Sequence, residues 1–162
     1  MKIFWIAAVL TSLVSGCCPC SKRTASPAAV RIAGCDLAAP WQIRFADGSA
    51  NVTTFSQDAD GKDSGVMKVS YEPMSARASS SGEYDGGQPF SGTVPDAVKP
   101  RLFDGIRRLA DDPQLRVERR EMGTGHFTIT AAGGQKCSFM IARGEPLEAF
   151  VAFLKSEVVP SR

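Results

Sequence analysis

The side chains most suited to chemistry in this 162-residue chain are its five cysteines. Cys17, Cys18 and Cys20 lie close together near the start, whereas Cys35 and Cys137 stand apart. A structural zinc site needs cysteines separated by two to four residues, with further ligands. Cys18 and Cys20 are separated by one residue, which is too few. We therefore expect no metal bound by these cysteines, and no motif in the chain indicates a cofactor.

The residues before Cys17 indicate that its thiol is modified. Lys2 supplies a positive start, and Ile3–Val14 is an apolar stretch too short to cross a bilayer as a helix of about 20 residues. The run Leu13-Val14-Ser15-Gly16-Cys17 resembles the lipobox of bacterial lipoproteins. This resemblance implies transfer of diacylglycerol to Cys17 and cleavage before it by the type II signal peptidase, so that residues 1–16 are a signal peptide.

The same resemblance implies a location. In the sorting pattern of enteric-type bacteria, an aspartate after the lipidated cysteine retains the protein in the inner membrane, and Cys18 stands there instead. We therefore expect a lipid anchor in the outer membrane, on its periplasmic face. Each buried CH₂ group contributes about 0.8 kcal/mol, so two or three acyl chains hold firmly. Residues 17–29 form the lipidated N-terminus and a tether, because Ser21–Ala29 is small, polar and proline-bearing.

Cysteines in such an oxidising compartment are expected to pair. Cys18 and Cys20 lie in the tether, while Cys35 and Cys137 lie beside predicted strands, so we favour a Cys35–Cys137 disulfide. In the chain-entropy model a loop of roughly a hundred residues makes this bond worth at most about 4–5 kcal/mol. Cys18 and Cys20 either form a local bridge or stay free.

His126 is the single histidine and the one candidate for a catalytic base. A catalytic triad needs a nucleophile, a base and a group that orients the base. No motif marks a serine or cysteine as the partner of His126, so an enzyme using it is only an alternative.

Asp58, Asp60 and Asp63 lie among glycines and raise the possibility of calcium binding. An EF-hand loop has glycine at its sixth position and a bidentate glutamate at its twelfth. Here glycine comes fourth and no glutamate follows at the twelfth position, so we favour an exposed turn.

The segment Glu83-Tyr84-Asp85-Gly86-Gly87 carries an aromatic side chain between acidic residues and glycines. Adaptable surfaces with an aromatic tip are typical of sites that bind protein partners. These five residues are the candidate partner-binding site, and an ordinary hairpin tip carrying one tyrosine is the commoner explanation of such a segment.

The order of elements from Tyr71 to Val159, with a glycine-rich strand pair over Ser81–Thr93, resembles the emfourin type of metalloprotease inhibitor. The resemblance implies that the glycine turn at Tyr84–Gly87 is an inhibitory tip that enters a protease cleft. The run Ser81-Gly82-Glu83-Tyr84 is also similar to a short motif of the membrane-bound lysozyme inhibitors, which are lipoproteins themselves.

The composition is that of one folded domain. The chain is 43% hydrophobic and 22% charged, which argues against a mostly disordered protein. The formal net charge of +2 includes Lys2, so the domain after the signal peptide is close to neutral. Nucleic-acid binding requires several phosphate contacts and is not expected. Residues 30–162 are long enough for a single domain.

Two periodicities predict the elements of this domain. Trp41, Ile43 and Phe45 alternate with polar residues as in a half-buried strand, and Asp47-Gly48 favours a type I′ turn into a return strand at 52–55. Apolar residues at helical spacing predict helices over 96–111, with Thr93 and Asp96 as a capping box, and from Pro146 onward. Further strands are expected at 66–71, 115–121, 126–131 and 136–142.

Strands, helix, strands, helix is the order of an α+β domain with a mostly antiparallel sheet and two amphipathic helices packed on one face. The sequence thus favours a non-catalytic, lipid-anchored envelope lipoprotein that acts as a protein-binding module, with an envelope protein as its partner. An envelope inhibitor of a hydrolase, either a protease or a lysozyme, is the alternative.

Overall fold

The computed structural model describes residues 30–59, 65–79, 82–83 and 86–159. The predicted signal peptide and tether, with Cys17, Cys18 and Cys20, lie outside the described residues. So do Tyr84 and Asp85 of the predicted partner-binding segment.

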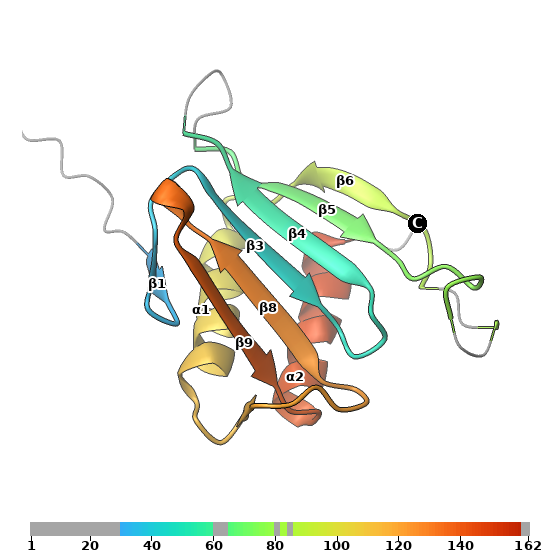
Figure 1. Cartoon of the computed structure of the whole chain (residues 1–162). Helices are drawn as coiled ribbons and strands as arrows, with labels where there is room; N and C mark the ends of the chain where they lie inside the picture. Colours follow the sequence, from blue (N-terminus) through green and yellow to red (C-terminus); the bar gives the residue numbers. More distant parts are fainter. Residues whose placement is uncertain (1–29, 60–64, 80–81, 84–85, 160–162) are drawn as a thin grey trace, which may run out of the picture.

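One seven-stranded antiparallel sheet forms the body of the domain (Figure 1). Its strand order is β6-β5-β4-β3-β8-β9-β7. The hairpin predicted from the Trp41 alternation therefore lies in the middle, and both ends of the sheet are short strands. The strands are β3 (Trp41–Ala46), β4 (Val52–Gln57), β5 (Lys68–Glu72), β6 (Phe90–Thr93), β7 (Arg116–Val117), β8 (Gly125–Thr130) and β9 (Lys136–Ile141).

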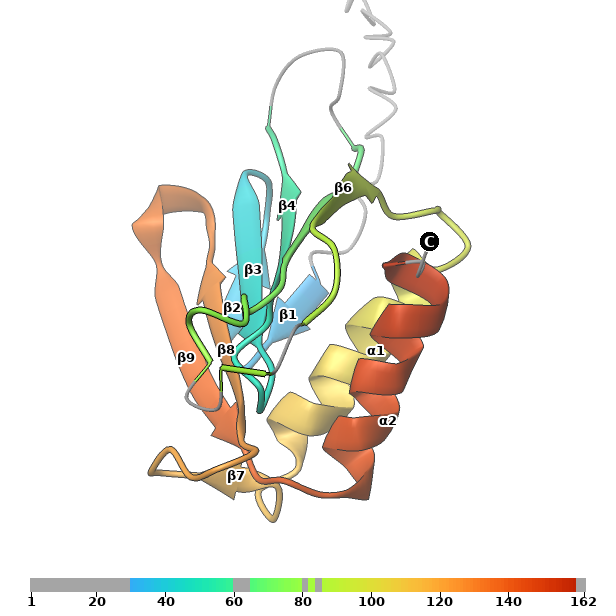
Figure 2. The same ribbon diagram turned by 90° about the vertical axis from the view of Figure 1, so that its right-hand side faces the viewer.

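Two helices cover one face of this sheet and leave the other face open (Figure 2). They are α1 (Lys99–Asp111) and α2 (Glu145–Phe153), and α2 continues into a five-residue π-helical turn, η2 (Leu154–Val158). The predicted α+β architecture is confirmed.

Aromatic rings fill the space between the two layers. Phe45 stacks on Phe127 at 4.5 Å between ring centroids, and Phe127 stacks on Phe139 at 4.9 Å. Phe150 of α2 meets Phe45 edge to face at 5.4 Å. Because Phe45, Phe127 and Phe139 occupy directly paired positions on β3, β8 and β9, the predicted alternation places them in one row under the helix.

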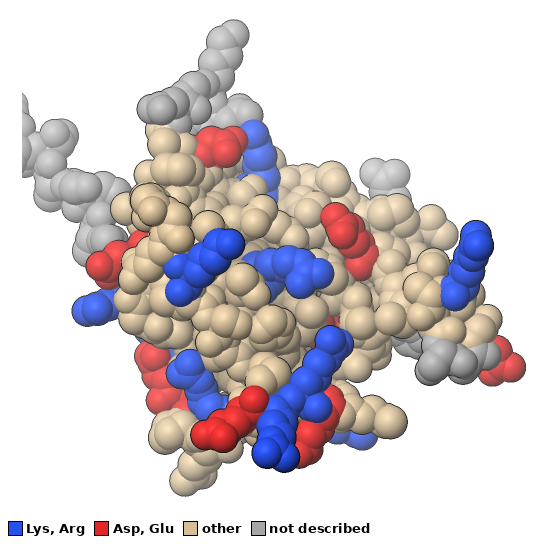
Figure 3. Space-filling model, in the orientation of Figure 1, with Lys and Arg blue, Asp and Glu red and all other residues tan. Residues whose placement is uncertain are grey.

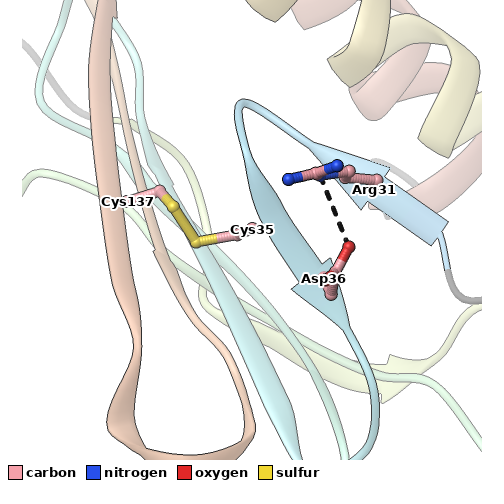
Figure 4. The surroundings of a disulfide bond; sticks show 4 residues. All are labelled: Arg31, Cys35, Asp36 and Cys137. Carbon is pink, nitrogen blue, oxygen red and sulfur yellow. Dashed lines mark ion pairs between the residues drawn. A yellow bond between two sulfur atoms is a disulfide. The ribbon is translucent and has the colours of Figure 1, made fainter.

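A second, two-stranded sheet joins the core through a disulfide (Figure 4). It is made of β1 (Val30–Ile32) and β2 (Cys35–Leu37), and its apolar side chains Ile32, Cys35 and Leu37 are buried. Cys35 is bonded to Cys137 of β9, 102 residues further along the chain, as predicted.

The β3–β4 connection differs from the predicted type I′ turn. Such a turn needs positive φ at its two central residues, whereas here the left-handed residue is Ala50, with φ 63°. The Asp47 carboxylate oxygen Oδ1 accepts hydrogen bonds from the backbone N–H groups of Ser49 and Asn51, each at 2.9 Å. These bonds favour a wider loop, which Ala50 closes by donating to the Asp47 carbonyl at 2.9 Å.

The predicted capping box of α1 is also wrong. The helix begins at Lys99, and its N-cap, Val98, makes no side-chain capping bond. Asp96 lies in the preceding turn, where its carboxylate pairs with Lys99 Nζ at 2.6 Å. Pro100 stands in the first turn, where its missing N–H costs nothing.

Two further predicted strands are shorter than expected. Of the 115–121 stretch only β7 is a strand: Arg116 and Val117 pair with Ile141 and Met140, and residues 118–121 do not continue the pairing along the rest of β9. In the predicted glycine-rich pair over Ser81–Thr93, the described residues form one strand, β6. Gly133 and Gly134 do turn the chain between β8 and β9, within the short helix η1 (Ala132–Gly134), with φ 73° and 81°.

Candidate functional site

The described part of the predicted partner-binding segment lies beside the helix-covered face of the sheet. Glu83 is exposed, whereas Gly86 is partly buried where the chain returns toward β6. Gly86 and Gly87 line a cavity between the sheet and the end of the α2 region. The structure places two residues of this segment beside a cavity, and binding of a partner there stays a prediction.

Gly86 is held on three sides. Its carbonyl accepts a hydrogen bond from the Tyr71 hydroxyl at 2.7 Å, and its N–H donates to the Met74 carbonyl at 3.0 Å. A Cβ at this position would overlap Asn51 Oδ1 and would approach Pro73 Cβ to 2.8 Å. Only glycine fits this approach, so the cavity wall here has a defined position.

Asn51 is the buried polar residue that organises this wall. Its amide Nδ2 donates to Asp47 Oδ2 at 2.8 Å, and its Oδ1 accepts from the Met74 N–H at 3.0 Å. The β3–β4 loop is thereby connected to the segment that follows β5. A buried amide with its hydrogen bonds satisfied in this way fixes the geometry of both segments.

The cavity beside Gly86 has a volume of about 720 Å³, within the usual range of ligand pockets. The sheet contributes Phe45, Thr53, Tyr71 and Phe90 to its lining, one residue from each of four adjacent strands. The α2 region contributes Val151, Leu154, Lys155 and Val159 on the opposite side. The cavity is therefore mostly apolar and aromatic, and its lining also includes one carboxylate, Asp47, and one cation.

Lys155 is that cation, and it lies between two cavities. It lines the first cavity and also a second one, of about 520 Å³, beside the β3–β4 loop. None of the ion pairs among the described residues includes Lys155. Sequence reasoning did not select this lysine. A signal was present, because Lys155 follows the inward-facing Val151 by four residues and therefore shares its side of the helix.

A third cavity, of about 740 Å³, lies on the outer surface between α1 and α2. Two of its charged lining residues, Arg101 and Asp104, are in ion pairs, whereas Arg108 is in none of the ion pairs among the described residues. Arg101 contacts Glu157 at 3.5 Å and lies over the Phe153 ring at 5.1 Å, and Asp104 pairs with Arg107 at 2.8 Å. The first cavity differs from this groove in its position, because Gly86 and Gly87 of the predicted partner-binding segment form part of its wall.

His126 has a hydrogen-bonded serine that sequence reasoning missed. On the open face of the sheet its Nε2 lies 2.8 Å from Ser138 Oγ, and which atom donates depends on the tautomer. The antiparallel register pairs Ser138 with Thr128, so Ser138 is the diagonal neighbour of His126 on the same face. The predicted strands alone did not identify Ser138 as this neighbour, because that requires the register of β8 against β9.

The environment of His126 is poor for a general base. Partial burial, followed by the charges of Arg120 and Arg44, lowers the pKa of His126 below its ordinary value of 6.5. A serine–histidine mechanism forms an imidazolium, which a carboxylate normally stabilises. The two arginines oppose that cation, and neither His126 nor Ser138 lines any of the three cavities described above.

The open face around this pair carries mainly short polar side chains. In Figure 3 several Lys and Arg side chains lie over the middle and lower part of this face, some of them beside Asp and Glu, and uncharged residues make up most of the remaining surface. The paired rows of the sheet place serines and threonines next to one another on this face: Ser56, Thr54, Ser70, Ser91, Thr93, Thr128, Thr130 and Ser138.

Residues 30–159, excluding the undescribed gaps, contain no group of three or more His, Cys, Asp or Glu side chains that could hold a metal ion. In the same residues no helix is long and apolar enough to span a bilayer. The predicted Asp58 turn is described only in part, and there Asp58 Oδ2 pairs with Lys68 Nζ at 2.9 Å.

Comparison with known proteins finds no matching family model, no similar curated protein and no similar solved structure.

Proposed function

We propose that this protein is a non-catalytic, lipid-anchored lipoprotein of the bacterial envelope that binds a protein partner. The lipid on Cys17 would hold it at the periplasmic face of the outer membrane, and residues 17–29 would let the domain reach its partner. The N-terminal sequence pattern supports the anchor, and the cavity beside Gly86 supports the binding role.

The observation that carries the binding role is the cavity of about 720 Å³ between the sheet and the α2 region, with Lys155 at its mouth. Apolar and aromatic surface with few fixed polar groups is the usual make-up of a binding pocket. The predicted partner-binding segment forms part of its wall through Gly86 and Gly87. A partner that covered this region would bury apolar surface and engage the lysine at once.

A capture experiment with the full-length protein in lipid nanodiscs tests this proposal. Wild-type protein and three variants, Lys155→Glu, Tyr84→Ala and Lys136→Glu, are incubated with envelope extract. Lys136 is an exposed lysine on the open face of the sheet, so its reversal makes the same charge change away from the cavity.

We expect one envelope protein to be retained by the wild type and by Lys136→Glu, and to be lost or strongly reduced with the other two variants. Equal retention by Lys155→Glu and wild type would contradict binding at this cavity. If the retained protein is a protease or a lysozyme, its activity in the presence of the wild-type protein decides the inhibitor alternative.

A further inference from the structure

We infer that the partner presents an extended segment that adds a strand to the free edge of β6, places an apolar side chain in the cavity below, and pairs an acidic group with Lys155. This inference rests on the proposed protein-binding function and specifies the form in which the partner is recognised.

The first observation is the free edge itself. β6 ends the order of the sheet and pairs with β5 on one side, and no described strand lies on its other side (Figure 1). Such an edge presents backbone N–H and C=O groups without sheet partners, which is the usual template for strand addition.

The register shows which backbone groups are available. In an antiparallel pair, residues bonded to the neighbour alternate with residues whose N–H and C=O point away from it. The Val94 N–H donates to the Met67 carbonyl at 2.9 Å in the same register as the β5–β6 pair. The groups of Phe90 and Gly92 therefore face β5, and those of Ser91 and Thr93 point outward from the free edge.

The second observation is that the cavity lies beneath this edge. Phe45, Thr53, Tyr71 and Phe90 form one row of paired positions that ends at β6, and all four line the cavity. A strand added beside β6 would continue the row, so its residue opposite Phe90 would project toward the same side of the sheet.

Room for that side chain comes from a glycine. A Cβ on Gly92 would lie 2.7 Å from the Phe90 Cζ atom, which shows that the Phe90 ring leans over Gly92 instead of extending across the cavity. Because Gly92 has no side chain, the ring can lie there and leave space below its own position. The incoming side chain would pack against Phe90, Tyr71 and the apolar residues of the α2 region.

Charge indicates the chemistry of the incoming segment. Lys155 is exposed at the mouth and is absent from the ion pairs of the described residues. The nearby Asp47 carboxylate already accepts bonds from the Ser49 N–H, the Asn51 N–H and the Asn51 side-chain amide. Lys155 is thus the charge available to a partner, and an aspartate, a glutamate or a chain-terminal carboxylate complements it.

The short length of β6 explains why both contacts are needed. Pro89 and Pro95 flank the strand, and proline donates no backbone hydrogen bond, so pairing is confined to the residues between them. So few backbone bonds bind weakly and without selectivity. The cavity and Lys155 would supply the selectivity, by accepting an apolar side chain and an acidic group at fixed distances along one segment.

A display library of random eight-residue peptides, selected on the full-length protein in lipid nanodiscs, tests the inference. We expect enriched peptides to combine an apolar residue with an aspartate, a glutamate or a free C-terminal carboxylate. Absence of any enriched peptide would overturn recognition of an extended segment. That outcome would not contradict the proposed protein-binding function, because the capture experiment can still retain a folded partner.

Strand addition itself is tested on the tightest peptide from that selection by N-methylating its amides one at a time. Each methyl group removes one donor and blocks one backbone contact. We expect at least a tenfold loss of affinity at alternate positions and little change at the positions between. Equal effects at successive positions would rule out a strand. This measurement uses the wild-type protein and so does not depend on how any variant folds.

The matched protein variants are Ser91→Pro and Ser91→Ala. The Ser91 N–H points away from β5, so proline there removes no bond within the sheet and closes the free edge. We expect Ser91→Pro to weaken peptide binding at least tenfold with an unchanged circular dichroism spectrum, and Ser91→Ala to stay within twofold. If Ser91→Pro still captures the envelope partner as well as the wild type while Lys155→Glu does not, the binding function stands and strand addition is wrong.

Discussion

The Tyr71 hydroxyl donates a hydrogen bond of 2.7 Å to the carbonyl of Gly86, fifteen residues further along the chain. This bond joins β5 to the segment that forms one wall of the first cavity, because both residues line that cavity. The binding segment predicted from the sequence is therefore connected directly to the sheet.

Replacing Tyr71 by phenylalanine should loosen this wall. The partly buried Gly86 carbonyl loses its donor, and we expect the free energy of unfolding to fall by about 1 kcal/mol. Urea denaturation measures the change, with Ser70→Ala on the open face as the control. A Tyr71→Phe variant as stable as the wild type would show that the bond does not secure the segment.

The Cys35–Cys137 disulfide should be a major source of stability. It closes a loop of 102 residues, which in the chain-entropy model corresponds to about 4.7 kcal/mol as an upper value. We expect reduction of the wild type to lower its midpoint of denaturation to that of the Cys35→Ala/Cys137→Ala double variant. The double variant should not respond to reductant, and a reduced wild type that unfolds at the oxidised midpoint would contradict this role.

Acid should destabilise the domain in part through His126. Burial, Arg120 and Arg44 lower the folded-state pKa below 6.5, so the unfolded chain binds the proton more tightly. The contribution of His126 to the free energy of unfolding is therefore complete above pH 6.5. It is lost as the pH falls through the folded-state pKa of His126.

Two measurements check this behaviour. NMR titration of the imidazole should give a pKa below 6.5. The loss of stability between pH 7.5 and pH 5 should be smaller in His126→Gln than in the wild type, because carboxylates contribute equally to both. An unchanged difference between the two proteins across this range would show that the pKa of His126 is not lowered in the folded protein.

The lipid anchor should depend on one thiol. Cells labelled with radioactive palmitate should label the wild-type protein and Cys18→Ala, but not Cys17→Ala. The Cys17→Ala protein should also keep residues 1–16, which its electrophoretic mobility and N-terminal sequence would show. Labelled Cys17→Ala protein would place the lipid elsewhere and remove the basis for the proposed location.

Periodicity in the sequence was sufficient for the main elements of the fold. The alternation at Trp41, Ile43 and Phe45 is a local consequence of a strand with one buried face, and the apolar stripe of α1 follows equally from helix geometry. The Cys35–Cys137 pair followed from which cysteines stood beside predicted strands. The strand and the helix could be predicted from residues close together in the sequence. The disulfide could be predicted because few cysteines were available to pair.

Details that depend on contacts between distant segments were not accessible in this way. The β3–β4 turn follows the hydrogen bonds of Asp47 instead of the preference of the Asp-Gly pair, and Thr93 and Asp96 do not cap α1 because Asp96 pairs with Lys99. The Ser138 partner of His126 depends on the register of β8 and β9.

The sequence by itself was sufficient to predict the α+β class and the Cys35–Cys137 disulfide, because the class follows from local periodicity and the pairing from which cysteines lie beside strands. The N-terminal lipid anchor stays a prediction from a short motif. Only the tertiary structure decided that Gly86, Tyr71, Phe90 and Lys155 surround one cavity below a free sheet edge. These residues come from three separate parts of the chain: β5, the segment leading into and including β6, and η2. Their meeting is set by the packing of α2 against the sheet, which no local pattern specifies.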